Sequence, residues 1–97
     1  MHTKKFKEGL NTAVFTTKFV VRDKKAITYV SHYLEDGAWQ FSSDDDFENY
    51  EDNAMILSLD EIIQLDKSIL EIADLPLGFI ATRNRKTDNW TITKNEI

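Results

Sequence analysis

The sequence has 97 residues, 41% of them hydrophobic, which suits one globular domain and excludes a second core. It contains no cysteine, so disulfides, thiolate metal sites and thiol nucleophiles are excluded, and a reducing cytoplasm is the expected compartment. The net charge is −5, and the negative charge is concentrated in an acidic block at residues 26–66, which has eleven carboxylates and no lysine or arginine. Such a block disfavours nucleic acid and favours a basic partner.

The N-terminal segment 1–10 is rich in lysine, and we predict that it forms a basic tail outside a single domain at 11–97. It lacks the apolar run and the small-residue cleavage site of a secretory signal. Elsewhere the apolar runs are short, far below the roughly 20 residues that span a bilayer. We therefore expect a cytoplasmic protein that does not enter membranes.

The first part of the domain is predicted to contain three strands. Residues 13–21 alternate between more and less apolar side chains, and residues 26–33 are rich in β-branched and aromatic types. The polar turn at 22–25 between them predicts an antiparallel hairpin. An Asp-Gly pair at 36–37 predicts a second tight turn, followed by a strand at 38–41.

Two short helices are predicted after a short buried strand at 54–57. Ser58 and Glu61 have the spacing of a capping box, in which each side chain bonds the backbone amide of the other residue. Asp66 is positioned to cap a second helix at 67–75. We therefore expect two consecutive helices before the C-terminal region.

The C-terminal region is predicted to form a second hairpin. Pro76 and Gly78 end the second helix, and the strand-like segments 79–84 and 90–94 are joined by polar residues. The order of elements predicts an α+β fold: a single domain with a mainly antiparallel sheet and two short consecutive helices inserted before the C-terminal hairpin. We expect both helices on one face of the sheet.

Residues 44–52, DDDFENYED, concentrate six carboxylates and two aromatic rings in nine positions. A calcium-binding EF-hand loop starting at Asp44 is excluded, because its sixth position is Asn49 instead of glycine and its twelfth is Met55 instead of glutamate. A weak, nonspecific cation site is the metal hypothesis that remains. We predict neither a dedicated metal site nor a cofactor.

The aromatic residues of this segment distinguish it from an ordinary solvated turn. Phe47 and Tyr50 are predicted to anchor the loop on the sheet, to present an aromatic contact surrounded by negative charge, or to do both. An anchored loop presents its carboxylates rigidly, which lowers the entropy cost of binding. The predicted partner-binding residues are Trp39, Asp44, Asp45, Asp46, Phe47, Glu48, Tyr50, Glu51 and Asp52.

The sequence carries no catalytic signature. Ser42, Ser43 and His32 supply a nominal nucleophile and base, but no GxSxG elbow surrounds the serines. We therefore expect a non-enzymatic protein, monomeric or homodimeric, that binds a basic protein such as a toxin. Two alternatives stay open: an enzymatic or small-molecule-binding domain with a pocket of residues such as Trp39, His32 and Arg83, and an accessory homodimer formed through a strand edge.

Several short patterns occur in a characteristic order. They are a turn with Asp36, Gly37 and Trp39, an aromatic residue at Phe41, an acidic stretch from Asp44 to Glu51 that includes Tyr50, and the helical pattern of Leu65, Asp66 and Ile69. This order resembles a family of small bacterial proteins of unknown function that is also classified, from genome context, as immunity proteins of polymorphic-toxin systems. The resemblance covers residues 13–92 and departs from the family pattern at Ala38. It implies a non-enzymatic binder.

Overall fold

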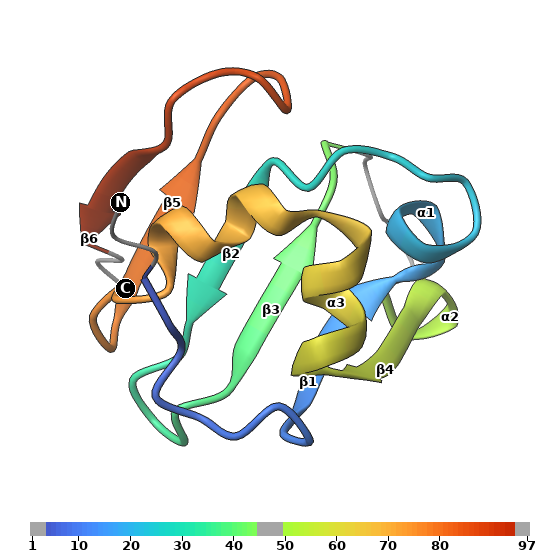
Figure 1. Cartoon of the computed structure of the whole chain (residues 1–97). Coiled ribbons are helices and arrows are strands. Elements are labelled where there is room, and N and C mark those ends of the chain that lie inside the picture. Colours follow the sequence, from blue (N-terminus) through green and yellow to red (C-terminus); the bar gives the residue numbers. More distant parts are fainter. Residues whose placement is uncertain (1–3, 45–49, 95–97) are drawn as a thin grey trace.

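The computed structural model describes residues 4–44 and 50–94, and Figure 1 shows their arrangement. The strands are β1 (Ala13–Thr17), β2 (Tyr29–His32), β3 (Trp39–Ser42), β4 (Ala54–Ser58), β5 (Phe79–Thr82) and β6 (Thr91–Lys94). The helices are α1 (Lys18–Val21), α2 (Tyr50–Asn53), α3 (Leu59–Leu65) and the 3-10 helix η1 (Lys67–Ile72). The described strands form one sheet in the order β4-β1-β3-β2-β5-β6, antiparallel except between β1 and β3. The predicted α+β class is confirmed.

The predicted hairpin between residues 13–21 and 26–33 is wrong. β1 ends at Thr17, whose hydroxyl accepts a hydrogen bond from the Val20 amide at 3.4 Å and caps α1. The helix turns the chain out of the sheet, and Lys24 in the following connection has a left-handed conformation with φ 57°. β1 therefore pairs with β3 and β4, whereas β2 lies between β3 and β5.

The other local predictions are largely confirmed. β2 and β3 form an antiparallel hairpin, and Gly37 in its turn has φ 73°, which glycine adopts without strain. The capping box of Ser58 and Glu61 starts α3, Asp66 caps η1, and β5 pairs with β6. The strand at 54–57 is present as β4, but the prediction of burial is wrong, because β4 is an edge strand and its Ile56 is 63% exposed.

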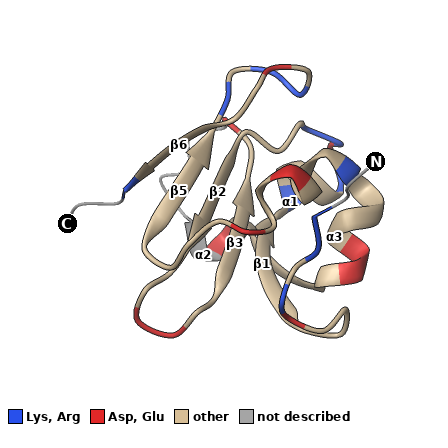
Figure 2. Cartoon of the chain, turned by 60° about the vertical axis from the view of Figure 1, so that its left-hand side comes forward, with Lys and Arg blue, Asp and Glu red and all other residues tan. Residues whose placement is uncertain are grey.

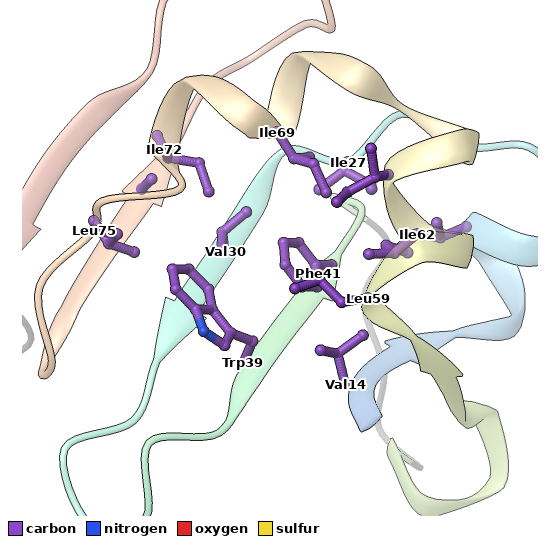
Figure 3. Packing of buried hydrophobic residues seen from close by; sticks show 13 residues of the cluster. Val14, Ile27, Val30, Trp39, Phe41, Leu59, Ile62, Ile69, Ile72 and Leu75 are labelled. Carbon is purple, nitrogen blue, oxygen red and sulfur yellow. The ribbon is translucent and has the colours of Figure 1, made fainter. Parts of the chain in front are cut away.

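The hydrophobic core lies between the sheet and the layer formed by α3 and η1 (Figures 1 and 3). Val30 and Phe41 occupy opposite positions on β2 and β3 and point towards these helices, where Ile62 and Ile69 belong to the same cluster. All four side chains are fully buried. Burial of such a side chain contributes about 1.5–3 kcal/mol, so the sheet and the helix layer stabilise one another.

A buried ion pair joins the junction between α3 and η1 to the sheet. Arg83 Nη2 lies 3.0 Å from Asp66 Oδ2, and the two side chains are 1% and 5% exposed. The guanidinium also donates to the carbonyl oxygens of Ile27 at 3.0 Å and Lys86 at 2.7 Å, and it lies 3.9 Å from the centre of the Trp90 ring. The planar, many-donor guanidinium therefore links several segments through one side chain.

The segment before β1 packs against the sheet. The Phe6 ring meets the Trp39 ring edge-on with centroids 5.0 Å apart, and the indole Nε1 of Trp39 donates a hydrogen bond to Glu8 Oε2 at 2.9 Å. Lys4 Nζ lies 3.2 Å from Asp74 Oδ1 at the surface. Residues of the predicted basic tail therefore contact the domain, while the predicted division of the chain at residue 11 stays a prediction.

Candidate functional site

The acidic segment that was predicted to bind a partner lies only partly within the described residues. Asp44, just after β3, and Asp52, in α2, are both exposed. The backbone of Tyr50 and Glu51 belongs to α2, which leads directly into β4. The segment therefore connects an inner strand to the edge of the sheet. The predicted residues Asp45, Asp46, Phe47 and Glu48 lie outside the described residues.

Trp39, the remaining residue of the predicted partner-binding set, lies in the core. Its side chain is 1% exposed. The ring stacks on Phe41 with centroids 5.9 Å apart and on His32 with centroids 3.9 Å apart. A side chain this deeply buried has no surface to offer a partner, so its effect on binding is limited to positioning its neighbours.

A groove of about 460 Å³ opens beside Asp44. Successive side chains of a strand point to opposite faces, so Tyr29 and Ser42 lie on the opposite face from Val30 and Phe41. Part of the groove is therefore formed by the face of the sheet that is turned away from α3. Figure 2 shows α3 on one side of the strands. It is lined by Thr28, Tyr29, Tyr33, Gln40, Ser42, Ser43, Asp44, Thr82 and Arg83.

A chain of hydrogen bonds crosses this face between β2 and β3. The Tyr33 hydroxyl donates to Gln40 Oε1, and Gln40 Nε2 donates to Ser42 Oγ at 3.1 Å. Because Tyr33 uses its only proton on Gln40, its oxygen can meet a further group only as an acceptor. The groove therefore offers a tyrosine ring with an acceptor at its tip.

The protonation state of Tyr33 is favourable for this arrangement. Burial raises the pKa of Tyr33 above its ordinary value, and so do the neighbouring Tyr29 and the carboxylates of Asp36 and Glu35, while a hydrogen bond with the Ser31 side chain opposes the rise. The hydroxyl therefore remains neutral and donates at physiological pH.

The one basic residue among the described lining residues is Arg83. Its guanidinium pairs with Asp66 at 3.0 Å, and its side chain is 1% exposed. The charge of Arg83 is thus compensated inside the protein and is not presented at the surface. The other charged residue among the described lining residues is Asp44, whose carboxylate is exposed.

The nominal serine and histidine do not form a catalytic pair. His32 lies opposite Trp39 and stacks on its ring in the core, whereas Ser42 lies on the groove face. The Nδ1 of His32 donates to the Leu75 carbonyl oxygen at 2.7 Å, and Nε2 lies 3.7 Å from Glu8 Oε2. His32 therefore connects the turn before β5 and the N-terminal segment to the sheet.

Of the residues named for an alternative pocket, Trp39 and His32 lie at one end of β2, and Arg83 lies near the other end. Trp39 and His32 stack at the end of the strand, while the Arg83 amide donates a hydrogen bond to the Thr28 carbonyl oxygen just before the strand begins.

In the part of the chain that the structure describes, no group of three or more His, Asp or Glu could hold a metal ion. Within the same residues, no helix is long and apolar enough to cross a membrane.

Of the groove residues, sequence reasoning placed Asp44 in the partner-binding set and named Ser42, Ser43 and Arg83 for other roles. It missed Thr28, Tyr29, Tyr33, Gln40 and Thr82. Their signal was the row of polar side chains at alternate positions, Tyr29, Ser31 and Tyr33 on one strand and Gln40 and Ser42 on the next. Alternation identifies one face of each strand. Alternation does not show that the polar face of β2 lies beside the polar face of β3, because that depends on the register between the two strands.

Comparison with known proteins identifies a family. The family model described as the immunity protein Imm33 domain matches residues 14–94. No curated protein and no solved structure matches the chain. The matched region begins in β1, ends with β6 and includes the groove, so it covers all of the described sheet except Ala13.

Proposed function

Because the chain belongs to the family of the immunity protein Imm33 domain, we propose that it protects the cell that makes it by binding and blocking a protein toxin. The family match over residues 14–94 is the observation that carries this proposal. In this proposal the protein acts in the cytoplasm without catalysing a reaction: it occupies the toxin surface that would otherwise reach a target.

The proposed partner is basic. Eleven carboxylates and no lysine or arginine lie between residues 26 and 66, and Asp44 and Asp52 are exposed in the structure. Complementary charge increases the association rate and excludes partners of the wrong sign. Toxins that act on nucleic acid need positive surfaces, and an acidic inhibitor would compete directly for such a surface.

The proposed contact region is the acidic segment at residues 44–52 together with the groove beside it. Asp44, Asp45, Asp46, Glu48, Glu51 and Asp52 would supply the charge, and Phe47 and Tyr50 the apolar contacts. The buried Trp39 would support the sheet beneath and would not touch the toxin. This division follows interfaces in which a few anchors are surrounded by a polar rim.

The proposal is tested by comparing two triple variants with the same change in net charge. The first is Asp44→Asn, Asp45→Asn and Asp46→Asn. The control is Asp60→Asn, Glu71→Gln and Asp74→Asn, which removes three exposed carboxylates in α3, in η1 and just after η1. Each protein is used to capture partners from host lysate, and a captured basic protein is then expressed alone to measure its toxicity.

The wild type and the control variant should retain a basic protein that stops growth, and coexpression of the wild type should restore growth. The first triple variant should bind that protein on the order of tenfold more weakly and with a smaller salt dependence. Failure to restore growth would refute the immunity function. An equal loss of binding in the two variants would refute the acidic segment as the contact region.

Homodimer formation through a strand edge is a second candidate, favoured by the exposure of β6. Its four residues are all exposed, and among the described strands it pairs only with β5. An exposed edge can pair with the edge of another chain. Sedimentation at several concentrations would detect this association, and a constant monomer mass would reject it.

A further inference from the structure

The groove lining defines the chemistry of one group that would fit it. We infer that the groove receives an arginine side chain of the toxin, an inference that rests on the proposed function and specifies what the acidic surface recognises. The features that support this inference are the two tyrosines, the direction of the hydrogen bonds and the placement of charge. The proposed contact residues are Tyr29, Tyr33 and Asp44.

The volume and surface of the groove suit a planar cation. It encloses about 460 Å³ and is open to solvent, and Tyr29 and Tyr33 both line it. A guanidinium group is planar, stacks on aromatic rings and is less strongly hydrated than an ammonium group. Two tyrosine rings can therefore bind the side chain of arginine along its length while its charged end stays near water.

The available hydrogen-bonding groups favour a donor as the occupant. The Tyr33 oxygen accepts only, because its proton is used on Gln40. The Asp44 carboxylate also accepts and is exposed at the groove. A guanidinium has five donors and no acceptor, so it matches these groups, whereas a carboxylate or phosphate would meet acceptors and negative charge.

The internal arginine does not oppose this occupant. Arg83 lines the groove, but its guanidinium is paired with Asp66 at 3.0 Å and also donates to the Ile27 and Lys86 carbonyl oxygens. The positive charge is thus compensated within the protein. The exposed carboxylate of Asp44 is not paired with Arg83, so its negative charge can attract a cation.

The first test uses a small probe and needs no toxin. N-acetyl-arginine methylamide is titrated into the 15N-labelled protein, with the citrulline analogue, which has nearly the same shape but no charge, as the control. Arginine should shift the backbone amides of Tyr29, Tyr33, Gln40 and Asp44 more than citrulline does. In Asp44→Asn its affinity should fall by about two- to fivefold, the range for an exposed ion pair.

Asp60→Asn is the matched control, because it removes an exposed carboxylate from α3 and should leave the affinity for the probe unchanged. Tyr33→Phe is a second variant that removes the acceptor and keeps the ring. Equal shifts by arginine and citrulline, or shifts located away from the groove, would overturn the inference.

The second test uses the captured toxin and separates the two proposals. If the wild type binds the toxin, Asp44→Asn and Tyr33→Phe should each weaken the complex by about two- to fivefold, while Asp60→Asn should not. A toxin that binds all four proteins equally would overturn the arginine site and leave the immunity function standing. If the wild type binds no toxin, the proposed function fails, and the probe titration alone decides whether the groove recognises arginine.

Discussion

The ion pair between Asp66 and Arg83 is expected to be a large single contribution to stability. We consider the replacement Asp66→Asn, which keeps the shape of the side chain and removes its charge. Asp66 Oδ1 accepts hydrogen bonds from the Ser68 amide at 3.0 Å and the Ser68 hydroxyl at 2.5 Å. An asparagine oxygen can still cap η1 in this way, so the main loss is the charge opposite Arg83.

The magnitude follows from burial. The two side chains are 1% and 5% exposed, so removal of the carboxylate leaves a guanidinium charge inside the protein without its counter-charge. Breaking a buried pair from one side costs about 3–5 kcal/mol. The exposed pair of Lys4 and Asp74, at 3.2 Å with side chains 51% and 65% exposed, is worth below about 1 kcal/mol because solvent screens it.

Urea unfolding followed by tryptophan fluorescence and circular dichroism measures the difference. With a slope of about 1–3 kcal/mol per M, typical of small proteins, Asp66→Asn should lower the unfolding midpoint by at least about 1 M. Asp74→Asn should change it little. A double variant, Asp66→Asn with Arg83→Met, should recover part of the loss, because no buried charge remains. If Asp66→Asn and Asp74→Asn had equal effects, the reasoning from burial would be wrong.

Four further outcomes are expected. Ser58→Ala should destabilise the protein by about 1 kcal/mol in urea unfolding, because it removes the N-cap of α3. Hydrogen bonds from Ser58 lower the pKa of Glu61. Their contribution to the free energy of unfolding is therefore present above the unfolded-state pKa and is lost as the pH falls through the folded-state pKa. In Glu61→Gln the free energy of unfolding should depend less on pH in the acid range. Gly78→Ala should cost about 1–2 kcal/mol in thermal unfolding, because φ is 81° there, although the added methyl group would meet Leu34 only in ordinary contact. Because the pKa of Tyr33 is raised, ultraviolet titration should show a late-ionising component that Tyr33→Phe removes. The associated stability should be present below the unfolded-state pKa and lost as the pH rises through the folded-state pKa.

The features predictable from the sequence are those that depend on nearby residues. The turn at Gly37, the capping box of Ser58 and Glu61 and the cap at Asp66 each rest on contacts within a few positions, and all are present. Local hydrogen bonds of this kind are specified by residue type and spacing. The α+β class followed because these elements occur in a recognisable order.

The features that could not be predicted depend on distant pairings. Residues 18–21 continue the strand-like pattern of β1, and only the structure shows that Thr17 caps a helix there. The partners of β1 lie more than twenty residues away on β3 and β4, and periodicity carries no information on them. Similarly, alternation placed Trp39 and Phe41 on one face but could not show that α3 and η1 cover that face.

The position of β1 has a consequence for how the chain folds during its synthesis. Among the described strands β1 is synthesised first, yet it is an inner strand whose two neighbours are β3 and β4. Phe15 finds its opposite residues, Gln40 and Ile56, only after those later segments have been made. Pairing over such separations is slow, and it leaves apolar strands exposed in the meantime. We expect the nascent protein to remain without a complete sheet, and therefore without its groove, until most of the chain has emerged.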